Sequence, residues 1–274
     1  MKVVILGNGL LGKELAKLTQ WDSVSRKTHD FDFKDVTSCY RFIKDYDVIV
    51  NCIAHTDTYD KEKEKHWNIN FKAVSRLTDW CRENNKKLVH ISTDYVYANT
   101  NHVASEEEVP VHAENWYSYT KLLADGYIEL KSEDYLIIRC GHKPAPFKFP
   151  KAYDDMLGNF DYVNIIAKGI IDLIKHNKSG IYNVGTEQKS MYDLALITNI
   201  DVEKDKAPGW MPKDIRMNCD KYKRAVGYDL DGKYDHLQEW VDIKEAQMKD
   251  TAFRDFQKRQ DNFEDDFENQ PFGD

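Results

Sequence analysis

The amino end of the chain joins a short apolar run, a glycine-rich turn and a helical pattern. The apolar run spans residues 2–6, and residues 10–19 have helical spacing. In the turn between them, Gly7 permits a tight bend, Gly9 lets a ligand approach the backbone N–H groups, and Gly12 lets the helix pack on the strand. A G-x-G-x-x-G turn in this context favours pyrophosphate binding over a turn that binds nothing, and it predicts a dinucleotide-binding unit.

Apolar runs alternate with helical patterns along the first two thirds of the chain, and no hairpin signal separates them. Such alternation is typical of βαβ units with parallel strands. The chain is therefore predicted to be α/β, with a Rossmann-type doubly wound parallel sheet and a small C-terminal substrate-binding lobe. The predicted strands cover 2–6, 23–25, 47–53, 87–92, 135–139 and 180–184, and the predicted helices cover 10–19, 61–83, 116–130 and 162–176.

Composition shifts suggest where the parts of the chain meet. Residues 1–140, together with about 160–185, are predicted to form the Rossmann domain. Prolines at 144, 146 and 150 indicate an irregular segment over 141–159, which we assign with 186–250 to the small lobe. Residues 251–274 are rich in acidic and amide side chains and are predicted to be a disordered tail.

Charge and cysteine usage exclude several classes of protein. The net charge is −8 and no basic stripe is visible, which argues against a nucleic-acid partner. Five scattered cysteines without a C-x-x-C pair indicate reduced thiols, a cytoplasmic protein and no metal site. No apolar window approaches the length of a membrane span, so no membrane association is expected.

The residues after the second predicted strand bear on cofactor choice. An NAD site usually has an acidic side chain there, whereas an NADP site has a cation. This chain has Ser25, Arg26 and Lys27 instead, so NADP(H) is preferred and NAD(H) remains possible. A solvated loop cation is the alternative reading of Arg26. Asp32 and Phe33 are expected near the adenine, and the third strand ends in a segment expected beside the cofactor, namely Cys52, Ile53 and Ala54.

A tyrosine and a lysine four residues apart, Tyr117 and Lys121, are the strongest candidates for chemistry. On a helix this spacing places both side chains on one face. A nearby ammonium favours the phenolate, so Lys121 is expected to lower the Tyr117 pKa. The spacing alone is common, and it gains weight from Thr93, which follows a predicted strand 24 residues before Tyr117.

With these residues in order, the sequence resembles the extended short-chain dehydrogenase/reductase family, most closely its dTDP-4-dehydrorhamnose reductase type. The resemblance is strong over residues 1–140 and looser over about 160–230. The matching segments are Gly7–Gly12, Asn51–Thr56, Ile91–Tyr97, Tyr117–Lys121, Leu136–Arg139, Gly180–Val184 and Asp214–Asn218.

The resemblance implies an NADPH-dependent reductase of a nucleotide-linked 4-keto-6-deoxy sugar. Tyr117 would donate a proton to the carbonyl oxygen, Thr93 would hydrogen-bond the same oxygen, and Lys121 would hold the nicotinamide ribose. Asp94, Tyr95 and Arg216 would contact the substrate together with Thr93. The implied cofactor site comprises Gly7, Asn8, Gly9, Leu10, Leu11, Gly12, Ser25, Arg26, Lys27, Asp32, Phe33, Cys52, Ile53, Ala54, Tyr117 and Lys121. Dimers are common in the family, which leaves a homodimer open.

One segment departs from the resemblance and keeps other functions open. Tyr182 lies only 43 positions after Arg139, and residues 143–150 do not match the family's pattern. A nucleotide-sugar epimerase that uses NAD(P) is the nearest alternative within the enzymes. A non-catalytic NADP-binding regulatory subunit is the alternative outside them.

Overall fold

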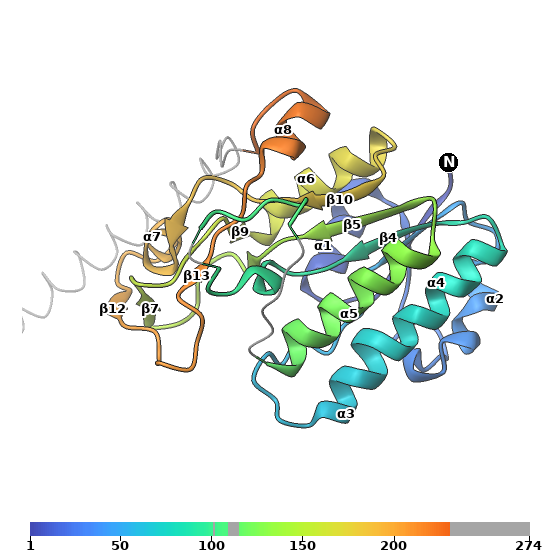
Figure 1. Cartoon of the computed structure of the whole chain (residues 1–274), viewed down its shortest axis with the longest axis horizontal. Helices are drawn as coiled ribbons and strands as arrows, with labels where there is room; N and C mark the ends of the chain where they lie inside the picture. Colours follow the sequence, from blue (N-terminus) through green and yellow to red (C-terminus); the bar gives the residue numbers. More distant parts are fainter. Residues whose placement is uncertain (101, 109–114, 231–274) are drawn as a thin grey trace, which may run out of the picture. The chain divides into compact units, whose positions relative to one another are not determined.

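The computed structural model describes residues 1–100, 102–108 and 115–230 of the chain. Its centre is a sheet of six parallel strands in the order β10-β5-β4-β3-β1-β2 (Figure 1). The strands are β1 (Val3–Leu6), β2 (Asp22–Val24), β3 (Val48–Asn51), β4 (Lys87–Ile91), β5 (Tyr135–Arg139) and β10 (Gly180–Asn183). The order reverses at β1, which lies between β2 and β3, and ligands bind at such switch points in open α/β sheets. The predicted Rossmann-type parallel sheet is confirmed.

Helices cover both faces of this sheet. On one face α1 (Leu10–Thr19) packs against α6 (Val163–Lys175), and on the other α4 (Ala73–Glu83) packs against α5 (Trp116–Lys131). The predicted long helix over 61–83 begins at α3 (Lys63–His66) and reaches α4 through a wider π-helical turn, η2 (Trp67–Lys72). The fully buried strands β1, β3 and β4 place Val, Ile and Leu side chains between the two helical layers.

Residues 33–43, for which the sequence pattern predicts no element, form η1 (Phe33–Cys39) and α2 (Tyr40–Ile43). Both lie beyond β2, and Phe33, Cys39 and Ile43 pack into the core beside α4. A 3₁₀ turn, η3 (Asp94–Tyr97), follows β4, and its first turn is capped by Thr93, whose hydroxyl accepts the Tyr95 N–H. Such single turns are too short for a periodic apolar pattern.

The segment expected to be irregular, 141–159, contains short strands that pair with later parts of the chain. Here β6 (His142–Lys143) pairs with β9 (Asp161–Tyr162), and β7 (Lys151–Tyr153) pairs with β12 (Glu203–Asp205). A third small sheet joins β8 (Leu157–Gly158) to β11 (Lys189–Ser190) and β13 (Asp214–Ile215). Helices α7 (Met191–Leu196) and α8 (Asp220–Val226) follow in the part of the chain that forms these small sheets. The predicted tail over 251–274 lies outside the described residues.

Candidate active site

A cavity of about 550 Å³ lies at the carboxyl ends of β1, β3, β4 and β5. Each of these strands ends in residues of the cavity wall, because parallel strands bring their carboxyl ends to the same sheet edge. The wall combines the glycine turn, the end of β2 and the start of α5 with two short strands of the small sheets, β6 and β13, and with the start of α7. It therefore contains residues from almost every predicted motif and from a segment that the sequence pattern left unassigned.

The glycine turn forms one end of the cavity. Gly7 has φ +108°, and a Cβ there would lie 2.9 Å from the Ile53 side chain. A Cβ on Gly12 would lie 2.2 Å from the Gly7 carbonyl oxygen, whereas a Cβ on Gly9 would meet no atom within 4 Å. The three glycines therefore do what the motif predicts: Gly7 turns, Gly12 permits close helix packing, and Gly9 leaves open space before the amino end of α1.

The end of β2 provides two cations. Ser25, Arg26 and Lys27 line the cavity, in a turn closed by the N–H groups of Thr28 and His29, which donate to the Ser25 carbonyl. Arg26 and Lys27 are exposed, and within the described part of the chain neither side chain has an ion-pair partner. Phe33 also lines the cavity, but Asp32 does not, because it lies in a separate shallow depression beside Arg41.

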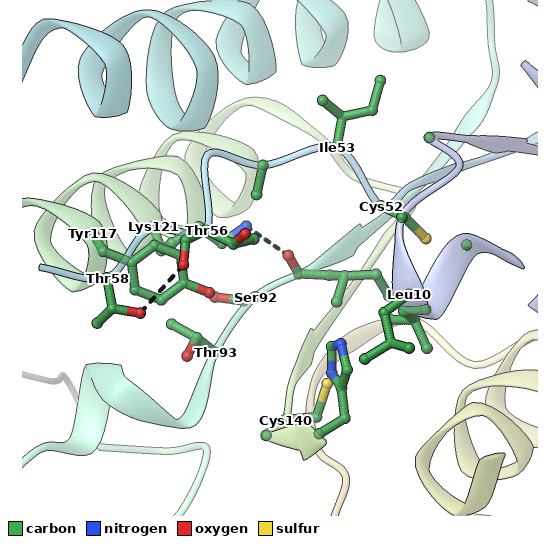
Figure 2. Close-up of a pocket in the computed structure, with 18 of the residues that line it drawn as sticks. Leu10, Cys52, Ile53, Thr56, Thr58, Ser92, Thr93, Tyr117, Lys121 and Cys140 are labelled. Atoms are coloured by element: carbon green, nitrogen blue, oxygen red, sulfur yellow. Dashed lines mark hydrogen bonds between the residues drawn. The ribbon is translucent and has the colours of Figure 1, made fainter. Parts of the chain in front are cut away.

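The three candidate catalytic residues meet on one wall of the cavity. Thr93 follows β4, and Tyr117 and Lys121 lie one turn apart near the start of α5 (Figure 2). The Asn115 side chain caps the start of helix α5 by accepting the Ser118 N–H at 2.8 Å. This cap fixes where the helix begins and therefore where Tyr117 lies in its first turn. Ser92, the other hydroxyl at this position, donates to Asp125 at 2.9 Å and is thereby committed to the scaffold.

The expected effect of Lys121 on the Tyr117 pKa is not what the structure shows. Burial raises the pKa of the Tyr117 phenol well above its ordinary value, with a smaller opposing effect from the hydrogen bond to Thr93. Burial also lowers the Lys121 pKa to about 8, and its Nζ donates to the Ile91 carbonyl at 2.6 Å. Burial disfavours the Tyr117 phenolate and the Lys121 ammonium alike, and it is the largest effect on the pKa of each.

The substrate-side residues fall into two groups. Asp94 and Tyr95 line the cavity, and the Tyr95 hydroxyl lies 3.2 Å from that of Tyr59. Arg216 does not line it. Its guanidinium instead pairs through two hydrogen bonds, of 2.8 and 2.6 Å, with the carboxylate of Asp214.

Sequence reasoning missed much of the opposite wall, which comes from the segment after β5 and from the small sheets. His142 and Lys143 of β6 lie there near Asp94. Burial lowers the His142 pKa to about 4 and raises the Asp94 pKa to about 6, with Lys143 opposing the latter shift. Among the residues that the structure describes, neither Asp94 Oδ2 nor His142 Nδ1 has a hydrogen-bond partner. The other unassigned wall residues are Thr56, Thr58, Cys140, Gly141, Met156, Phe160, Met191 and Ile215.

Other site chemistries find no support among the described residues. No cluster of three or more His, Cys, Asp or Glu side chains there is arranged to hold a metal ion. No helix in the same ranges is both long and apolar enough to cross a membrane. All five cysteines are free thiols.

Known proteins with a similar sequence or fold share this architecture. The dTDP-4-keto-6-deoxy-D-glucose reductase of Streptomyces niveus is 27% identical over 215 residues, which cover 69% of this chain and 74% of that protein. The crystal structure of a dTDP-4-dehydrorhamnose reductase from Clostridium acetobutylicum superposes with a TM-score of 0.75 at 22% identity, covering 89% of this chain and 100% of that one. A dTDP-4-dehydrorhamnose reductase from Bacillus anthracis, solved in complex with NADP, has a TM-score of 0.70 at 22% identity, with 83% and 94% covered.

The family model described as the RmlD substrate binding domain matches residues 1–142. This range spans the glycine turn, the Thr93 segment and the Tyr117/Lys121 pair, which carry the predicted resemblance. It also covers more than half of the 274 residues. The chain therefore belongs to the RmlD substrate binding domain family.

Proposed function

We propose that the protein is an NADPH-dependent reductase of a nucleotide-linked 4-keto-6-deoxy sugar, with Tyr117 as the proton donor. The observation that carries this proposal is the meeting of Thr93, Tyr117, Lys121 and the glycine turn in one cavity at the carboxyl edge of the sheet. Relatives named as reductases of dTDP-linked 4-keto sugars support the substrate class.

The glycine turn and the end of β2 suit an NADP-type cofactor. Open space at Gly9, directly before α1, suits a pyrophosphate at a helix N-terminus. Arg26 and Lys27 line the same cavity and are free to pair with a 2′-phosphate. The complex of the Bacillus anthracis relative with NADP agrees with this assignment. When bound, the cofactor supplies the hydride.

The protein's own contribution is to place an acid where negative charge develops on the carbonyl oxygen. Because burial raises its pKa, Tyr117 is fully protonated at neutral pH and ready to donate. Thr93 lies beside it, and its hydroxyl, which otherwise donates to Asp94 Oδ1 at 3.2 Å, would turn to donate a second hydrogen bond to the same oxygen. Lys121 is fixed one turn further along the helix, where it orients the cofactor's ribose.

Turnover by the purified protein tests the proposal directly. We expect NADPH oxidation, followed by absorbance, with at least one of the 4-keto-6-deoxy sugars linked to dTDP, GDP, CDP or UDP. Tyr117→Phe is expected to lower kcat by about 10²- to 10⁴-fold, the usual contribution of a positioned acid, and to leave NADPH affinity unchanged. Tyr119→Phe is the matched control, because Tyr119 is 40% exposed and does not line the cavity.

Two results would redirect the assignment. Tightly bound oxidised NAD that survives gel filtration, without net NADPH oxidation, would indicate an epimerase. Normal activity of a partner enzyme with Tyr117→Phe, and no turnover of any sugar, would indicate a regulatory subunit.

A further inference from the structure

Behind the cavity wall, three buried polar side chains form a hydrogen-bonded chain from β3 through β4 to α5. Asn51, His90 and Lys121 are each no more than 1% exposed. Asn51 Nδ2 lies 3.2 Å from His90 Nδ1, and His90 Nε2 lies 3.0 Å from Lys121 Nζ. His90 is not among the cavity-lining residues, so it acts on the site through the side chains it contacts, of which Lys121 lines the cavity.

The amide of Asn51 sets the tautomer of His90. The Ile53 N–H donates to Asn51 Oδ1 at 3.1 Å, which leaves the amide NH₂ directed at His90 Nδ1. An NH₂ group only donates, so His90 Nδ1 must accept. Burial, the largest cause, lowers the His90 pKa well below its ordinary value, so the ring is neutral and carries its one proton on Nε2.

This tautomer directs an N–H group at Lys121. An ammonium has three donors and no acceptor, whereas a neutral amine has a lone pair. With His90 Nε2–H facing it, Lys121 Nζ is satisfied only as the amine, which accepts from His90 and donates to the Ile91 carbonyl at 2.6 Å.

The charges around Lys121 are consistent with this arrangement. Asp125 favours the ammonium, but its carboxylate is paired with Arg139 at 3.1 Å and accepts from Ser92. The other two groups acting on Lys121 are the thiols of Cys52 and Cys140. Burial raises the pKa of both thiols, to about 12 for Cys52, so neither carries charge at neutral pH.

We propose that Asn51 and His90 are positioning residues that shift the protonation equilibrium of Lys121 toward a neutral, hydrogen-bond-accepting amine in the cofactor-free protein. This inference rests on the proposed function only for its role in turnover, since the hydrogen-bonded chain itself involves no ligand. If Lys121 takes up a proton, His90 must carry its own proton on Nδ1, where it meets the Asn51 NH₂. Turning the Asn51 amide would relieve that contact but would set its NH₂ against the N–H of Ile53, a cavity residue.

Asn51→Asp tests this coupling with a side chain of nearly the same shape. A carboxylate accepts from both the Ile53 N–H and a His90 Nδ1–H, so His90 Nε2 becomes an acceptor for the Lys121 ammonium. We expect the midpoint of Lys121 titration, followed by NMR of ¹³C-labelled lysine in the cofactor-free protein, to rise by at least one pH unit. That is a tenfold change in the protonation equilibrium. The pH midpoint of NADPH oxidation is expected to move in the same direction.

A second substitution separates the hydrogen-bonded chain from direct attraction between the new carboxylate and Lys121. In a His90→Leu background the hydrogen-bonded chain is broken. Asn51→Asp should then raise the midpoint of Lys121 titration by less than half as much as it does when His90 is present. A shift of equal size in both backgrounds would show plain Coulomb attraction and overturn the proposal.

The imidazole ¹⁵N spectrum gives an independent decision if His90→Leu fails to fold. The proposal requires the Nε2–H tautomer in the wild-type protein and the Nδ1–H tautomer in Asn51→Asp. An Nδ1–H tautomer in the wild type would refute it. Because these titrations need no substrate, they remain decisive even if no sugar is turned over.

Discussion

The two walls of the cavity are built in different ways. The cofactor-side wall consists of the glycine turn and the end of β2, where backbone groups are paired and space is left by missing side chains. The opposite wall contains Asp94, His142 and Lys143, which are ionisable and enclosed, and two of which present an unpartnered polar atom.

This difference shows which wall is complete without a ligand. Buried polar atoms in folded proteins are nearly always hydrogen-bonded, so unpartnered ones indicate a site that awaits polar groups. The cofactor-side wall can be formed by local geometry alone. The opposite wall carries electrostatic strain that a sugar with hydroxyl groups would relieve.

The cofactor-side wall should lose more stability than the opposite wall when a methyl group is added, because its glycine turn is closely packed. In Gly12→Ala the new Cβ would lie 2.2 Å from the Gly7 carbonyl oxygen, and backbone atoms must shift to admit it. We expect the free energy of unfolding, measured by urea denaturation, to fall by about 3 kcal/mol. Gly9→Ala is the matched control: it should cost less than about 1 kcal/mol, yet weaken NADPH binding by filling the open space. Equal losses of stability would contradict the separate roles of the two glycines.

The strain on the opposite wall should appear as a pH dependence of stability. Burial raises the folded-state pKa of Asp94 to about 6 from an ordinary value of 3.8. The folded state therefore binds more protons between these values, and stability is lost as pH rises from about 4 to 6. Compared with Asp94→Asn, the wild type should lose up to about 3 kcal/mol over this window, as measured by urea denaturation at successive pH values. If the difference in free energy of unfolding between the wild type and Asp94→Asn stayed constant with pH, the Asp94 pKa would not be raised in the folded state.

Cofactor selectivity tests the cations of the first wall. Arg26→Ala should raise the Kd for NADPH by about 10- to 100-fold, because a charge-assisted contact to the 2′-phosphate is worth about 1.5–3 kcal/mol. The Kd for NADH should not change, and fluorescence titration measures both. Arg224→Ala removes another exposed arginine, on α8 and outside the cavity, and should affect neither cofactor. If Arg26→Ala weakened the binding of NADPH and NADH equally, Arg26 would contact a group that both cofactors share.

The smallest effect is expected from β6, the short strand that directly follows β5. Lys143→Met keeps an unbranched side chain but removes the cation beside Asp94, and kcat/KM for the sugar should fall about 10-fold while the Kd for NADPH is unchanged. Steady-state kinetics with Lys148→Met as control measures this, since Lys148 is exposed in the same segment and does not line the cavity. An unchanged kcat/KM in Lys143→Met would remove Lys143 from the substrate side.

Local patterns were sufficient for the sheet and for most of the cofactor-side wall. Helix α1 and strand β5 have the predicted bounds, because uninterrupted periodicity and a glycine turn specify these elements within a few residues of sequence. Asp32 was expected near the adenine, but it lies in a separate depression beside Arg41, whereas the next residue, Phe33, lines the cavity. The placement of Arg216 on the substrate side was also not supported, since Asp214 takes its guanidinium.

The sequence by itself determined the order of the elements, the glycine turn and the shared helix face of Tyr117 and Lys121, since all of these depend on residues close together in the chain. Only the tertiary structure decided what surrounds them. His90 meets Lys121, and β6 brings His142 and Lys143 to Asp94, through pairings between residues 31 to 49 positions apart. Desolvation also depends on the whole fold, and for this reason the Tyr117 pKa rises where local charge alone predicted a fall.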